Sequence, residues 1–109
     1  MKTSELQGAA LDWAVAKAAE EMFGFYSGDF YVVGEDAPYH PSTNWAQGGP
    51  IIERERLSVV CQQGHPPFWS AGCPRAVYKG YGPTPLVAAM RCYVASKLGD
   101  EVEIPEGLK

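Results

Sequence analysis

Apolar residues near the N-terminus recur at steps of three and four, which is the spacing of one face of an α-helix. This face consists of Leu11, Val15, Ala18 and Met22. Ser4 and Gln7 have the spacing of a capping box and Gly24 is a suitable stop, so the pattern predicts a helix from Ser4 to Met22. A second face is also apolar, which indicates cover on both sides of the helix. Its residues are Leu6, Ala9, Trp13 and Ala16.

A second helical pattern lies near the C-terminus. Thr84 is a good N-cap, Pro85 suits the first helical position, and Gly99 suits the position after the last turn. Apolar residues share one face of this segment, namely Leu86, Val87, Met90, Tyr93, Val94 and Leu98. The sequence therefore predicts a helix from Pro85 to Leu98.

The middle of the chain is rich in glycine and proline, so any strands there must be short. Four apolar runs are candidate strands: Phe30–Val33, Leu57–Cys61, Phe68–Ala71 and, more weakly, Ala76–Tyr78. Pro50 can begin a short helical turn that reaches Glu55, and Gly80–Gly82 reads as a turn. We expect an α+β fold in which two α-helices pack on a small antiparallel sheet of short strands.

Composition narrows the class of protein. The chain has 109 residues, 46% of them hydrophobic and 20% charged, which is typical of one globular domain. We expect residues 1–109 to form this domain, with residues 100–109 as an acidic C-terminal tail. The net charge of −4 argues against binding to long nucleic acid, and the absence of a long apolar run argues against a membrane span. Three cysteines without CxxC spacing are typical of reduced thiols in the cytoplasm.

Three segments of the sequence together resemble a known family. They read TSELQGAALDWAVAKAA from Thr3, YHPSTNWAQGGPIIERE from Tyr39, and GPTPLVAAMRCY from Gly82. The chain resembles the NinX-like proteins of lambdoid phages and prophages, also described as a phage αβα sandwich domain. The resemblance implies a phage accessory protein that acts in the cytoplasm of a bacterial host. It supplies no catalytic residues.

The usual motifs for nucleotide binding, metalloprotease and hydrolase chemistry are absent. Zinc could be held by Cys61, His65, Cys73 and His40, but their spacing matches no common finger. His65 could also activate Cys61 or Cys73 as a nucleophile, although the sequence shows no third, orienting group. We therefore assign no catalytic residues, no metal and no cofactor. The sequence favours a protein that is not an enzyme, and leaves open whether Cys61, His65 and Cys73 bind a metal.

The best candidate site is the loop from Tyr39 to Pro50 beside the start of the second helix. Aromatic rings offer stacking surfaces, amides and hydroxyls offer directed hydrogen bonds, and a helix N-terminus favours an anion. The candidate ligand-binding residues are Tyr39, Thr43, Asn44, Trp45, Gln47, Thr84 and Arg91. The alternative is a structural loop in which Trp45 fills the core and the polar side chains serve nearby backbone.

These features favour a non-catalytic binding module that captures a small ligand such as a nucleotide, in a role against a host defence signal. One alternative is an interaction factor that docks on a host or phage protein, and a weaker one is a small Cys/His enzyme. A helix with two apolar faces also predicts a homodimer through the first helix, unless the chain itself buries both faces. The expected partners are thus a small molecule, a host protein or a second copy.

Overall fold

A computed structural model describes residues 1–26, 29–34, 37–74 and 78–108. The helices are α1 (Gly8–Ala18), α2 (Trp45–Glu55) and α3 (Pro85–Leu98), with short 3-10 helices η1 (Thr3–Glu5) and η2 (Glu106–Leu108). The strands are β1 (Phe23–Tyr26), β2 (Asp29–Val32), β3 (Ser58–Gln62), β4 (Phe68–Gly72) and β5 (Lys79–Gly82). The expected α+β class is confirmed, although the strands form two antiparallel sheets instead of one, of order β1-β2 and β3-β4-β5.

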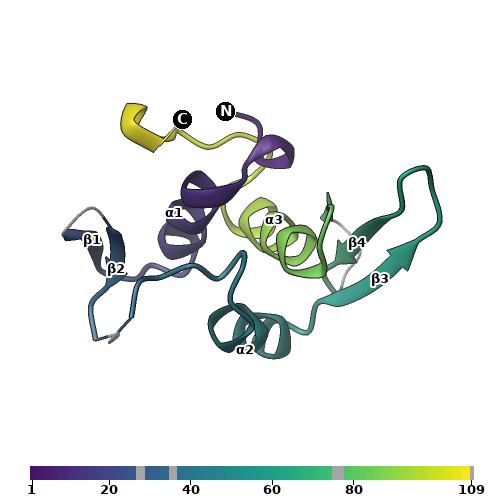
Figure 1. Cartoon of the computed structure of the whole chain (residues 1–109), viewed down its shortest axis with the longest axis horizontal. Helices are drawn as coiled ribbons and strands as arrows, with labels where there is room; N and C mark the ends of the chain where they lie inside the picture. The colour runs from purple at the N-terminus through teal and green to yellow at the C-terminus, as the bar shows by residue number, and fades with distance from the viewer. Residues whose placement is uncertain (27–28, 35–36, 75–77, 109) are drawn as a thin grey trace.

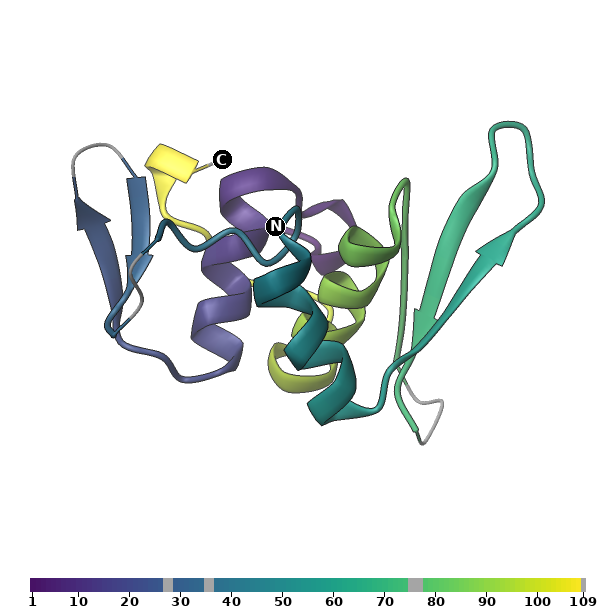
Figure 2. The same cartoon turned by 60° about the horizontal axis from the view of Figure 1, so that its bottom comes forward.

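The helices form the middle of the molecule, and one sheet lies at each end (Figure 1). The β1–β2 hairpin lies beside α1, whereas the three-stranded sheet lies beside α3. In Figure 2 the three helices run in the same direction, and the β3–β4 hairpin projects from the body. The layer order is therefore sheet, helices, sheet.

Two glycines of β5 let the three-stranded sheet approach α3 closely. A Cβ atom on Gly80 would overlap the Ala88 carbonyl oxygen and would lie 2.5 Å from the Cys92 nitrogen. On Gly82 it would lie 2.8 Å from Val87 Cγ1. These glycines belong to a strand, so the turn expected at Gly80–Gly82 is wrong. The expected strand Ala76–Tyr78 falls largely outside the described residues.

The predicted helix Pro85–Leu98 is confirmed at both ends. The Thr84 hydroxyl accepts a 3.1 Å hydrogen bond from the Val87 N–H, and Pro85 opens the first turn. Gly99 follows the last turn with a positive φ of 87°. Local chemistry at the caps was sufficient to define this helix.

The expected helix from Ser4 to Met22 is too long at both ends. The α-helix begins at Gly8, after a Gln7 cap whose side chain makes no capping hydrogen bond, and it ends at Ala18. The first residues are instead held by the C-terminal segment, because the Thr3 N–H donates to the Asp100 carbonyl at 2.8 Å. Met22 is 75% exposed and precedes β1, so it does not belong to the core face.

The helix α2 is longer than the short helical turn that the sequence predicts from Pro50 to Glu55. Asn44 caps it by accepting a 2.9 Å hydrogen bond from the Ala46 N–H, and the helix includes Pro50 in its interior. Gly48 packs against the Pro41 carbonyl and Leu86, with no room for a side chain. The cap and this close contact place the helix start five residues before Pro50.

The core lies between the helices and is closed by the C-terminal segment. Its fully buried members include Leu6, Leu11, Val15, Met90, Tyr93 and Val94. Val102 and Ile104 are also buried in this core and the half-buried Leu108 packs against it, so the acidic C-terminal segment lies on the body. No helix in the described ranges is long and apolar enough to cross a membrane.

We expect Gly80→Ala to lower the free energy of unfolding by about 1–3 kcal/mol, because its methyl group has no space against α3. Gly72→Ala is the matched control, since a Cβ there meets nothing within 4 Å, and its change should stay within about 0.5 kcal/mol. Urea denaturation measures both values. Equal stabilities of the two variants would contradict the close packing of β5 on α3.

Candidate functional site

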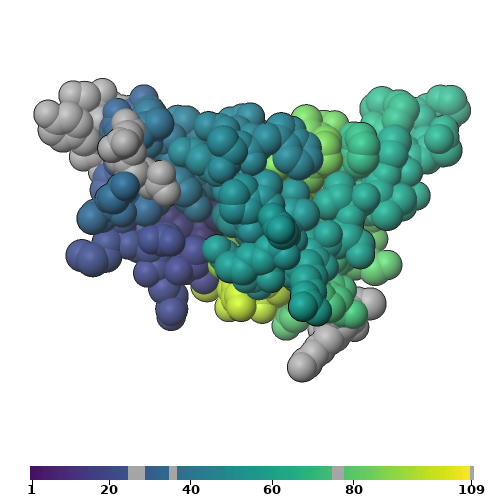
Figure 3. All heavy atoms as spheres, turned by 90° about the horizontal axis from the view of Figure 1, so that it is seen from below, coloured from purple at the N-terminus to yellow at the C-terminus, as the bar shows by residue number. Residues whose placement is uncertain are grey.

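A shallow groove lies where the N-terminal ends of α2 and α3 meet. Its volume is about 220 Å³, and its lining residues are Ser42, Thr43, Trp45, Thr84, Pro85, Leu86 and Val87. Figure 3 shows the face that carries α2, on which the segment before α2 meets the start of α3. The structure thus brings together three of the residues predicted for the site, namely Thr43, Trp45 and Thr84.

Trp45 is the first residue of α2 and is 56% exposed at the groove. The alternative in which this ring fills the core therefore does not describe the molecule. A large aromatic ring in water exposes apolar area that burial by a partner would stabilise. Trp45 is consequently the feature of the groove best suited to contact a ligand.

Three other predicted site residues serve the fold. Tyr39 is 7% exposed, and its ring packs in a T-shaped contact with Phe30 at a centroid distance of 6.2 Å. Burial raises the pKa of Tyr39 to about 12. Asn44 caps α2, while Gln47 accepts from the His40 N–H at 2.7 Å and donates to the Pro38 carbonyl at 2.9 Å. These side chains hold the loop in place beneath the groove.

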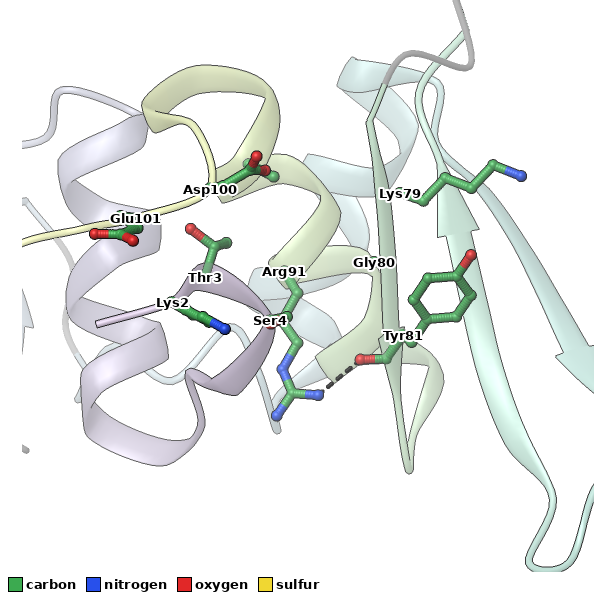
Figure 4. A pocket seen from close by; sticks show the side chains of 10 residues that line it. Lys2, Thr3, Ser4, Lys79, Gly80, Tyr81, Arg91, Asp100 and Glu101 are labelled. Atoms are coloured by element: carbon green, nitrogen blue, oxygen red, sulfur yellow. Dashed lines mark hydrogen bonds between the residues drawn. The ribbon is translucent and has the colours of Figure 1, made fainter.

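Arg91 lies apart from the groove, in a separate hollow of about 190 Å³. Its Nε donates to the Leu6 carbonyl at 2.8 Å and its Nη1 to the Tyr81 carbonyl at 2.7 Å (Figure 4). Partial burial lowers the pKa of this guanidinium. Arg91 therefore joins the N-terminal segment to the edge of β5 and is not placed to hold a ligand in the Trp45 groove.

The charges at the two ends of the helix layer differ. The C-terminal ends of all three helices surround one hollow of about 440 Å³. Its lining includes a cation from the last turn of each helix, Lys17, Arg54 and Lys97, together with the acids Glu20, Glu21 and Glu55. None of the three helices has an acidic residue in its first turn. The last-turn cations complement the helix dipoles at the C-terminal ends, whereas no first-turn acid does so at the N-terminal ends.

A carboxylate–imidazole cluster that the sequence analysis missed fixes the loop next to the groove. Asp12 is 2% exposed; its Oδ1 accepts from the Ser42 N–H at 2.9 Å, and its Oδ2 lies 3.2 Å from His40 Nδ1. His40 Nε2 lies 3.3 Å from Asp29 Oδ1, so the imidazole links α1 to β2. The single signal in the sequence was an aspartate that interrupts an apolar helix.

Burial raises the pKa of Asp12, and this effect is opposed by the Ser42 N–H, the Ser42 hydroxyl and His40. The hydroxyl oxygen of Ser42 is buried, and it makes no hydrogen bond of good geometry within the described part of the chain. The cluster is therefore a structural support that carries an electrostatic penalty when Asp12 is ionised.

The cysteines and histidines do not gather into a site. Within the described ranges, no three His, Cys, Asp or Glu side chains lie close enough to hold a metal ion. Cys61 is exposed, and Cys92 is buried, which raises its pKa to about 11. A thiol with a raised pKa is a poor nucleophile, so Cys92 is suited to packing.

Comparison with known proteins identifies a phage protein. The family model described as "Bacteriophage P22, NinX" matches residues 2–97, which is nearly the whole chain. The chain therefore belongs to the NinX family, as the three sequence segments indicated. No similar protein is found among curated sequences.

We expect Asp12→Ala to be less stable than Asp12→Asn by about 1–3 kcal/mol, because only asparagine retains an acceptor for the buried Ser42 N–H. Chemical denaturation at neutral pH measures the difference. If the two variants were equally stable, the Asp12–Ser42 hydrogen bond would not support the loop.

The same variants give a pH test. A carboxyl whose pKa is raised on folding contributes stability below its ordinary value of 3.8, and this contribution is lost as the pH rises through the raised pKa. The free energy of unfolding of the wild type relative to Asp12→Asn should therefore increase as the pH falls from 7 towards 4. A flat difference would show that the pKa of Asp12 is not raised.

Proposed function

We propose that this NinX-family protein is a non-catalytic binding module of the infected bacterial cytoplasm, and that it captures a small, planar, anionic ligand in the Trp45 groove. Nucleotides are the ligand class that combines a flat ring with negative charge. Removal of such a ligand from the host pool would blunt a defence signal built on it. The observation that carries the proposal is an exposed tryptophan between two helix N-termini.

The ring supplies the first part of the binding energy. A base stacked on an aromatic side chain is worth about 1–3 kcal/mol. Pro85, Leu86 and Val87 also line the groove, so a flat ring stacked on Trp45 would have further apolar atoms beside it. This arrangement favours a planar ring over a flexible chain.

The helix ends supply the second part. The groove lining includes no charged side chain, and the Asp12 carboxylate behind Ser42 is buried and is bound by the Ser42 N–H and His40. Pro85 has no N–H and the Val87 N–H is taken by Thr84, which leaves the Leu86 N–H as the free donor of the first turn of α3. Aligned dipoles with no acid in the first turns favour negative charge at this end.

The size of the groove limits the ligand. Small-molecule pockets usually span about 300–1,000 Å³, and this groove is smaller. It would therefore hold one ring or one phosphoryl group of a nucleotide and leave the rest in solvent. We expect modest affinity and recognition of one part of the ligand.

Docking on a protein is the second candidate function. Three large apolar side chains are exposed on one face of the three-stranded sheet, namely Val60, Phe68 and Tyr81. This surface is separate from the Trp45 groove, so the two functions are compatible.

We expect Trp45→Ala to weaken binding of adenosine monophosphate by roughly tenfold to a hundredfold, since stacking is lost and about 1.4 kcal/mol is tenfold. Isothermal titration calorimetry with a nucleotide panel measures this effect. Tyr81→Ala is the matched control because it removes another exposed aromatic ring that does not line the groove, and its affinity should equal that of the wild type. Adenosine without a phosphate should bind more weakly than its monophosphate.

Equal affinity of Trp45→Ala and wild type would contradict the groove as the site. Arg91→Ala should leave the affinity unchanged while lowering thermal stability, because Arg91 ties Leu6 to Tyr81 outside the groove. Native mass spectrometry of the protein from infected cells would identify the bound species directly.

A further inference from the structure

The two edges of the three-stranded sheet differ. At the β5 edge, Arg91 donates to the Tyr81 carbonyl, and the N-terminal segment lies across the adjoining hollow (Figure 4). At the other edge, the strand β3 pairs with β4 alone in the part of the chain that the structure describes. The β3–β4 hairpin also projects from the body, which leaves this edge open (Figure 2).

The direction of the hydrogen bonds shows which groups of β3 are free. The N–H and C=O of one strand residue point to the same side, and the side alternates along the strand. Tyr81 faces Arg91, away from β4, and its partner Ser70 therefore points towards Val60 of β3. It follows that Val60 bonds to β4, whereas the N–H and C=O groups of Val59 and Cys61 point outwards at the free edge.

This edge lacks the features that usually keep sheets apart. Natural edge strands are protected by charged side chains, prolines or bulges. The sequence of β3 is SVVCQ, with no charge and no proline, and its five pairs with β4 are consecutive, without a bulge. Val60, at the centre of the strand, is 52% exposed. Such an edge is suited to pairing with another strand.

We propose that β3 pairs antiparallel with β3 of a second copy of this chain, around a two-fold axis at Val60. In this register Val59 lies opposite Cys61 of the copy and exchanges both backbone hydrogen bonds with it, and the symmetric pair does the same. Ser58 then lies opposite Gln62. The product is one six-stranded sheet whose exposed apolar face runs across both copies.

A second copy fits this edge better than an unrelated strand for two reasons. Antiparallel pairing of a strand with itself is self-complementary, and the absence of charge means that no like charges meet. The assembly also stops at two, because pairing consumes the open edge and the outer edges are then the β5 edges that Arg91 closes. The interface is small, so we expect dissociation in the micromolar range.

Sedimentation equilibrium over a concentration series tests the dimer. We expect the mass to rise from 11.9 kDa towards twice that value. Amide hydrogen exchange gives an independent signal: exchange at Val59 and Cys61 should slow with concentration, whereas exchange at Val60 should be slow throughout. A monomer at every concentration would overturn the proposal.

Val60→Lys tests the position of the interface. The dimer would place two lysines directly opposite each other, so the dissociation constant should rise roughly tenfold or more. Tyr81→Lys adds the same charge to the same sheet face, two strands from the edge, and should dimerise like the wild type. Circular dichroism and melting temperatures establish that both variants fold.

Two results would overturn edge pairing while leaving a dimer. If Val60→Lys dimerises as the wild type does, the interface lies elsewhere, for example on the α1 face around Trp13. If Val60→Lys and Tyr81→Lys weaken the dimer equally, the copies pack face to face instead of edge to edge.

Discussion

The close contact of β5 with α3 at Gly80 and Gly82 determines much of this structure. Because neither residue has a side chain, the strand lies directly on the helix backbone at Ala88 and Cys92. This contact fixes which β5 groups face β4 and which face outwards, and it brings the Tyr81 carbonyl within reach of Arg91. Arg91 in turn holds the Leu6 carbonyl, and through it the entry to α1. One pair of glycines thereby links the sheet, the central helix and the N-terminal segment.

The shared direction of the helices gives the molecule two unlike ends. Lys17, Arg54 and Lys97 complement the three carboxyl ends, where carbonyl groups would otherwise concentrate negative potential. Asn44 and Thr84 cap the amino ends of α2 and α3, no first turn of the three helices carries an acid, and Trp45 is exposed at the start of α2. In the proposed site, helix amino ends and a stacking ring without a cationic side chain in the lining would suit a small anion better than a polyanion, in agreement with the net charge of −4.

Features that local chemistry determines could be predicted from the sequence, whereas features that tertiary contacts determine could not. Thr84, Pro85 and Gly99 define α3 by themselves, and three of the expected strands lie within one residue of β2, β3 and β4. The start of α1 was not predictable, because pairing with the Asp100 segment removes Thr3 from the helix. The extent of α2 was hidden by Pro50, whose preference for a first turn is overridden by the Asn44 cap and the Gly48 contact.

The residues of the candidate site also divide into those predictable from local chemistry and those placed by tertiary contacts. Its loop and the start of α3 were recognisable from residue types, and the structure brings Thr43, Trp45 and Thr84 to one groove. Residue types alone could not separate exposed Trp45 from buried Tyr39, or place Arg91 in a different hollow, since burial depends on the packing of distant segments. Asp12 and His40, 28 residues apart, meet only when the loop folds across α1.

The most direct test of the Trp45 groove as a ligand site is a map of backbone amide chemical shifts during titration with adenosine monophosphate. We expect shifts that saturate in the segment before α2, at Trp45 and in the first turn of α3, with none around Lys17, Arg54 and Lys97. Saturable shifts at the carboxyl ends of the helices, or no shifts at millimolar nucleotide, would contradict a ligand site at the amino ends.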